Sequence, residues 1–194
     1  MAGQEAVASV NGPMAKTLDD ITLFAKTIVD SQPWLLDPKC IPIPWRQVES
    51  NKKLKIAVLW NDGVVNPTPP VTRALKETVE KLQKTGHEIV EWDPALHSKA
   101  IELLVSFSTS IFGMPVLISK GRMFVADGGK SVEALLAPTN EPIRPEMQAY
   151  KDAEELGVHA MWQLHLERSE LQKKMLDLWM SYEGLDAILC KASF

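Results

Sequence analysis

The sequence predicts an α/β fold with a mixed sheet of about three strands covered by helices. Residues 54–60 form a continuous apolar run that is too short for a helix, which is typical of a buried strand in a parallel sheet. The amphipathic pattern of residues 68–86 predicts a helix, and the alternation of residues 87–92 predicts a second strand, so the three segments form a βαβ unit. Residues 187–190, a short apolar run after a long helical segment, supply the third strand.

The best-specified helix is predicted over residues 17–30. Asn11-Gly12-Pro13 forces a turn before it, and Thr17 can cap it, with Asp20 placed three residues later as in a capping box. Pro33 cannot continue it. Apolar residues recur at three-to-four spacing and predict one stripe that needs a core to face, formed by Leu18, Ile21, Phe24, Ala25, Ile28 and Val29.

Proline and glycine divide the rest of the chain into segments. The proline-rich stretch 34–53 is expected to lie extended across a surface. Further helices are predicted over residues 95–111 and 131–137. A long helical region is predicted from residue 146, with a break near Gly157.

The composition of the 194 residues, 45% hydrophobic and 24% charged, is that of a soluble globular protein. The net charge of −4 arises without any block of like charge, which argues against a nucleic-acid or acidic-lipid partner. No apolar run approaches the ~18 residues of a membrane span, and residues 1–4 do not begin a secretory leader. Cys40 and Cys190 lack metal-ligand spacing and are expected to be reduced thiols, so we expect a cytoplasmic protein.

No complete catalytic constellation is found from residue types and spacing alone. The run from Asp127 to Ser131 ends in Gly-Lys-Ser like a phosphate-binding loop, but Phe124 stands where that loop requires glycine, so a plain turn and helix cap is favoured. His159 and His165 lie six residues apart and point to different faces of a helix, and the other histidines also lack the spacing of a zinc site. We therefore expect surface or partly packed histidines, and neither a metal nor a cofactor.

Several motifs occur in an order that resembles the amidase-signature hydrolases, in particular the fungal general-amidase and acetamidase branch. Gly12 to Thr17 resembles the segment that follows the catalytic serine in that family. The later landmarks extend the resemblance over essentially the whole chain: Pro33-Trp34, Ile43 to Arg46, Leu54 to Trp60, Thr68 to Leu75, Gly86 to Glu88, Ala126 to Gly129 and Gly184 to Cys190. The resemblance implies a partial amidase-signature fold, with residues 1–194 forming the C-terminal part of a single amidase domain.

The resemblance also implies a chemistry that this chain does not complete. The family hydrolyses amides to acid and ammonia through an acyl-enzyme, using a lysine, a serine in a cis peptide and a nucleophilic serine. Those groups precede the Gly-Pro helix, so Lys16, Lys26 and Ser131 are not their counterparts, and no catalytic residue is assigned. We expect the chain alone to be inactive, as a fragment of an enzyme whose intact form acts on small amides.

At most, the resemblance places Phe124, Asp127, Gly128 and Gly129 at the border of the substrate pocket. A second hypothesis is a noncatalytic binding or dimerisation module derived from an amidase, with a homodimer as its partner state. The three predicted strands leave apolar edges and helix faces that a missing half would cover, so the fragment hypothesis predicts aggregation of the isolated chain.

Overall fold

The structure is a computed structural model that describes residues 4–7, 11–47, 52–104, 107–109, 115–117 and 123–191. The chain divides into two compact units. The larger unit combines Met1–Val7 with Lys53–Phe194, and the smaller one is Ala8–Lys52. Each unit is described by itself.

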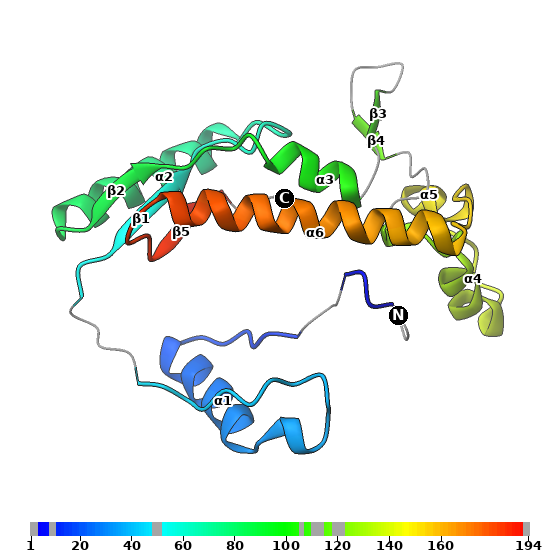
Figure 1. Cartoon of the computed structure of the whole chain (residues 1–194), viewed down its shortest axis with the longest axis horizontal. Coiled ribbons are helices and arrows are strands. Elements are labelled where there is room, and N and C mark those ends of the chain that lie inside the picture. Colours follow the sequence, from blue (N-terminus) through cyan, green and yellow to red (C-terminus); the bar gives the residue numbers. More distant parts are fainter. Residues whose placement is uncertain are drawn as a thin grey trace. The chain divides into compact units, whose positions relative to one another are not determined.

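A three-stranded sheet lies towards one end of the larger unit (Figure 1). Strand β1 (Lys55–Leu59) lies between β2 (Glu88–Glu91) and β5 (Ala187–Cys190), and both neighbours run parallel to it. The predicted α/β class, the three strands and the βαβ unit of the first two are thus confirmed. Among the named strands of the described segments, antiparallel pairing occurs in a separate two-stranded sheet, so the three-stranded sheet itself is parallel.

Strand β1 is apolar from Ile56 to Leu59 because helices cover both of its faces there. Val58, fully buried, packs with Leu75 and Val79 of helix α2 (Pro69–Lys84). Ala57 lies in a second cluster on the other face, with Trp92 and with residues near the end of helix α6 (Val158–Ser181). Adjacent strand residues therefore point into opposite layers, as the period of two requires.

A second core lies further along α6. Helix α3 (His97–Leu104) and the 3-10 turn η2 (Met123–Val125) meet the first half of α6 there, and Leu103 and Met123 are buried together with Ala6 from the N-terminal segment. Helix α6 is long enough, at 24 residues, to serve both cores, and it runs from the sheet towards the α4 and α5 region (Figure 1).

Short elements fill the stretch before α6. The expected short helix is confirmed as α4 (Lys130–Leu136), and Gly157, the expected break, is the residue that caps α6. The helical region expected from residue 146 is less continuous than predicted, since residues 152–157 belong to no helix. The elements between α4 and α6 are the turns η3 (Ala137–Thr139) and η4 (Pro145–Met147) and the helix α5 (Gln148–Lys151).

The expected helix over residues 95–111 is wrong at its end. Helix α3 stops at Leu104, and β3 (Phe107–Thr109) pairs antiparallel with β4 (Pro115–Leu117). Phenylalanine and threonine favour strands, and serine is a poorer helix former than alanine or leucine. These local preferences outweigh the helical spacing of the apolar residues before them.

The smaller unit contains helix α1 (Leu18–Asp30), which begins where the sequence predicts. The backbone N–H of Asp20 donates to Thr17 Oγ1 at 3.2 Å, and that hydroxyl donates to Asp20 Oδ2 at 2.8 Å. The turn η1 (Pro33–Leu35) follows the helix. No residue of α1 is buried in the described chain, and Leu18 and Phe24 are 75% and 52% exposed. Within the smaller unit, the apolar stripe is therefore present but only partly covered.

The helices of the described segments lack the combination of length and apolar sequence that a membrane crossing requires. Even α6 carries too many charged residues for a bilayer span, and the remaining described helices are too short or too polar as well.

Candidate functional site

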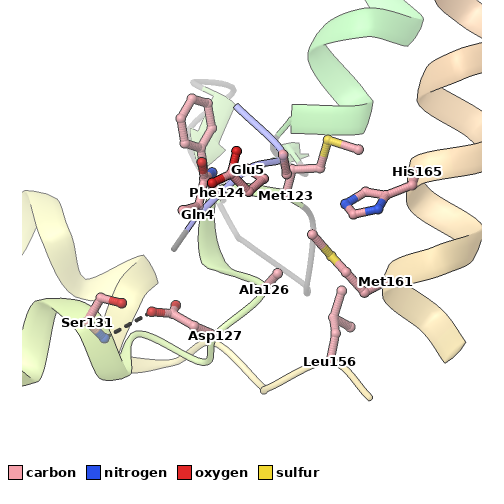
Figure 2. A pocket seen from close by; sticks show the side chains of 11 residues that line it. Gln4, Glu5, Met123, Phe124, Ala126, Asp127, Ser131, Leu156, Met161 and His165 are labelled. Atoms are coloured by element: carbon pink, nitrogen blue, oxygen red, sulfur yellow. Dashed lines mark hydrogen bonds between the residues drawn. The ribbon is translucent and has the colours of Figure 1, made fainter. Parts of the chain in front are cut away.

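The larger unit contains a half-open cavity of about 490 Å³ beside the second core (Figure 2). Three segments that are distant in sequence form its wall. The N-terminal segment supplies Gln4, Glu5 and Ala6. The second segment supplies five residues between Met123 and Ser131. The third segment consists of Leu156 and of residues in the first half of α6. Since no single element builds the wall, the cavity depends on the packing of the second core.

Most of the lining is apolar. Met123 is only 1% exposed, and Figure 2 shows Met161 and His165 projecting from one helix towards it. Phe124 and Leu156 close other sides of the cavity. A cavity of this size and lining is suited to the apolar part of a small molecule.

Asp127 organises the loop that forms one wall. Its Oδ1 accepts from the Gly129 N–H at 3.0 Å, and its Oδ2 accepts from the Ser131 N–H at 2.9 Å. Burial alone would raise the pKa of Asp127, but hydrogen bonds from the Ser131 hydroxyl and from these two N–H groups outweigh it and lower the pKa below its ordinary value. The carboxylate is thus held ionised and occupied by its own loop.

These contacts also explain why Gly-Lys-Ser does not form a phosphate-binding loop. The N–H groups of Gly129 and Ser131, which such a loop would turn towards a phosphate, donate to Asp127 instead. The structure therefore agrees with the plain turn and helix cap that the sequence favours.

Gly128 and Gly129 lie behind the cavity wall, not on it. Both have positive φ, at +65° and +77°, and both press against the segment before α6. A Cβ on Gly129 would lie 2.0 Å from the Tyr150 carbonyl oxygen, and one on Gly128 would lie 2.9 Å from the Glu155 nitrogen. Both positions therefore need glycine for close packing as well as for conformation.

The segment behind the loop is also fixed by polar contacts. Asp127 and Glu155 form an isolated antiparallel bridge, and Leu156 donates its N–H to the Ala126 carbonyl at 2.9 Å. Lys130 Nζ lies 2.5 Å from Glu155 Oε2. The loop and the residues before α6 thus form one rigid wall.

Of the four residues predicted at the substrate pocket, Phe124 and Asp127 lie on the cavity wall and the two glycines support it. Sequence reasoning missed His165 and the methionines. His165 lies four residues after Met161, a spacing that places both on one helix face, and its Nε2 is buried without a hydrogen-bond partner among the described residues.

The other histidines have structural contacts or face solvent. Trp92 Nε1 donates to His97 Nε2 at 2.9 Å, and the Leu54 N–H donates to His87 Nδ1 at 3.1 Å. His159 is exposed. Within the described ranges, no three residues of the metal-binding types come together as a site.

A second polar feature lies at the carboxyl ends of β1 and β5. Lys191 Nζ is 3.1 Å from Asp62 Oδ2 and donates to the Val65 carbonyl, and the two charged side chains are only 6% and 18% exposed. Burial alone would raise the pKa of Asp62, but N–H groups of Val65 and Val64 and the ammonium of Lys191 lower it below its ordinary value. The pair fastens the loop after β1 to the end of β5.

Comparisons with known proteins cover nearly the whole chain. The family described as Amidase matches residues 1–193. Amidase 1 of Gibberella moniliformis is 33% identical over 91% of this chain and 32% of its own length, and an acetamidase of Aspergillus oryzae is 30% identical over 97% and 34%.

The structure of a fatty acid amide hydrolase superposes with a TM-score of 0.79 at 30% identity, over 97% of this chain and 32% of that one. The chain therefore spans about a third of the length of the relatives it matches. The match confirms the resemblance that the sequence motifs indicate and extends across both units. The chain belongs to the amidase family.

Proposed function

We propose that this chain acts as part of an amidase that hydrolyses carboxylic amides to acid and ammonia. The cavity of about 490 Å³ beside Phe124 and Asp127 is the observation that carries the proposal, because it offers an apolar enclosure within a chain of the amidase family. The role of this chain is to wall the substrate pocket. Residues 1–194 form the C-terminal part of a single catalytic domain.

The sequence resemblance supports a division of labour in the reaction. The lysine and the two serines of amidases lie on segments that come before the Gly-Pro turn, and they form and break the acyl-enzyme. Residues of this chain hold the apolar group of the amide and exclude water from it. Phe124 and Met161 act through such contacts, while Asp127 fixes the loop that presents Phe124.

Ammonia release from acetamide and benzamide tests the proposal in two preparations. The first is this chain alone, for which no turnover above buffer is expected. The second is Amidase 1 of Gibberella moniliformis with its matched segment replaced by this chain. A folded chimera, verified by a cooperative thermal transition, is expected to hydrolyse at least one of the two amides.

Two outcomes contradict the proposal. Turnover by the chain alone would show that catalytic groups lie among its own residues. A folded chimera that hydrolyses neither amide would remove the pocket role. The control is Amidase 1 itself, assayed in parallel under the same conditions.

A noncatalytic dimerisation module is the second candidate, and the apolar side chains that α1 exposes within its own unit favour it. Leu23 and Ile28 are 67% and 47% exposed on the helix that also exposes Leu18 and Phe24. Apolar surface of this kind marks interfaces. A stable homodimer in analytical ultracentrifugation, lost in Phe24→Glu, would support this candidate, whereas irreversible aggregation would favour the fragment of an enzyme.

We infer a cytoplasmic location from the two cysteines. Cys40 and Cys190 are free thiols, as the sequence predicts, and unpaired cysteines suit a reducing compartment. Fractionation of cells that produce the tagged protein tests this, and recovery in the secreted fraction would contradict it.

A further inference from the structure

The cavity contains one polar atom whose bonding is incomplete. His165 Nε2 is buried and lacks a hydrogen-bond partner within the part of the chain that the structure describes. A buried polar atom in this state is unfavourable, because it has lost water and gained nothing in return. Since His165 lines the cavity, a molecule bound there can supply the missing partner (Figure 2).

The other polar groups of the wall are already engaged. Both oxygens of Asp127 accept from its own loop, and Ser131 is the donor to one of them. Gln4 Oε1 accepts from the Val7 N–H at 3.2 Å, and Glu5 has an interaction of its own. Among the described lining residues, His165 Nε2 is the buried side-chain nitrogen that lacks a hydrogen-bond partner, so a ligand gains most by bonding to it.

The charges around the cavity disfavour an anionic ligand. Glu5 and Asp127 place two carboxylates in the wall, and these repel an anion. The cation on the same helix, Arg168, lies one turn beyond His165 and donates from Nη1 to the Ala6 carbonyl oxygen. That contact holds the N-terminal segment against α6, and Arg168 does not line the cavity.

We propose that His165 Nε2 forms the hydrogen bond that orients a neutral amide carrying an aromatic or branched aliphatic group in this cavity. The inference rests on the proposed function and adds the substrate class. Met123, Met161 and Leu156 contact the apolar group, and a volume of about 490 Å³ leaves acetamide mostly without contacts. The carboxylate product is repelled by Glu5 and Asp127, which favours its release.

Binding of three probes to the full chain tests the inference without any need for turnover. All three probes contain one benzene ring. Benzamide adds a neutral amide, isopropylbenzene adds an apolar group of the same shape, and benzoate adds a negatively charged carboxylate. We expect wild type to bind benzamide about tenfold tighter than isopropylbenzene, the size of one net hydrogen bond, and to bind benzoate more weakly than benzamide. Affinities are measured by NMR titration.

Variants on one helix separate the hydrogen bond from packing. His165→Phe keeps an aromatic ring without the nitrogen, so the preference for benzamide over isopropylbenzene is expected to fall to about one. His165→Gln keeps hydrogen-bonding capacity and is expected to restore most of the preference. His159→Phe is the matched control, because His159 is exposed on the same helix and does not line the cavity.

An unchanged preference in folded His165→Phe would overturn the inference, as would the absence of benzamide binding to wild type. If His165→Phe does not fold, the ¹⁵N chemical shift of His165 Nε2 in wild type tests the hydrogen bond instead. We expect this shift to change when benzamide is added and not when isopropylbenzene is added. Equal changes with the two probes would overturn the inference. Failure of the proposed function is distinct, since it shows as an inactive chimera while the binding preference remains.

Discussion

Replacement of Gly129 by alanine is expected to destabilise the protein more than any other glycine change with the same backbone angle. The added Cβ would lie 2.0 Å from the Tyr150 carbonyl oxygen and 2.9 Å from its carbon. Both atoms belong to the backbone, so no side-chain rotation can relieve the overlap. The loop that carries Asp127 or the segment before α6 must move.

Two terms give the expected magnitude. Alanine in the left-handed region at φ +77° costs about 1–2 kcal/mol relative to glycine. Forcing a methyl group into a packed site adds about 1–3 kcal/mol. Gly129→Ala is therefore expected to lower the free energy of unfolding by roughly 2–5 kcal/mol, or the Tm by roughly 10 °C for a chain of this size.

Gly63 provides a matched control. Its φ is also +77°, but a Cβ there would meet nothing within 4 Å. Gly63→Ala therefore carries the backbone term alone, and a loss of about 1–2 kcal/mol is expected. Gly184, at φ +73° with open space around it, is a second control of the same kind.

Urea denaturation followed by tryptophan fluorescence measures the three variants against wild type. The steric argument requires Gly129→Ala to exceed both controls by at least about 1 kcal/mol. Equal losses in all three variants would refute it, because they would show that the wall adjusts to a methyl group without cost. A destabilised Gly63→Ala with an unaffected Gly129→Ala would refute the packing of the loop itself.

Three further predictions concern charged groups. Lys191→Met removes the cation beside Asp62, whose side chain is only 18% exposed. Urea denaturation at pH 7 is therefore expected to show a free energy of unfolding that is lower by about 2 kcal/mol. A decrease below about 0.5 kcal/mol would contradict the stabilising role of the ion pair. The pKa values of Asp62 and Asp127 are lowered in the folded state, so their stabilisation is present above the ordinary value of 3.8 and is lost as the pH falls through the lower folded values. The free energy of unfolding should therefore fall below about pH 4, with a shallower fall in Asp62→Asn. Arg168→Met removes the hydrogen bond to the N-terminal segment, and about fivefold to tenfold faster amide exchange is expected at residues 4–7, whereas unchanged exchange would contradict the contact.

The three-stranded sheet could be predicted because its signals are local. Strand β1 is apolar at every position after Lys55, and Gly86, at φ +86°, stands between α2 and β2. Thr17 and Asp20 likewise fix the start of α1 through contacts within one turn. An element whose boundaries depend on residues close together in the sequence can therefore be predicted from the sequence alone.

The stretch after α3 could not be predicted in the same way. Helical spacing of apolar residues continues past Leu104, but the strand at Phe107–Thr109 is completed only by its partner at Pro115–Leu117. Pairing between strands depends on side chains and turns that periodicity does not register. The second core has the same character, since Ala6 and Met123 meet there from segments that are far apart in the sequence.

The cavity was only partly foreseen. Phe124 and Asp127 were suggested by the family resemblance, not by local chemistry, and their contact with a substrate stays a prediction. His165 was interpreted as a partly packed side chain, which is correct for its exposure but misses the atom without a partner. The burial of His165 Nε2 depends on the packing of three segments that are distant in the sequence. The spacing of His165 from Met161 is the one local signal of it in the sequence.

The position of Asp127-Gly128-Gly129 argues for a supporting role in substrate selection. The carboxylate is occupied by donors from its own loop, and both glycines face the segment before α6, so the motif has little left to offer a ligand. What it does is hold Phe124 against the cavity in one conformation. Selectivity among amides should then depend on the residues that the motif positions and on His165 opposite, and substitutions in the motif should change stability before they change preference.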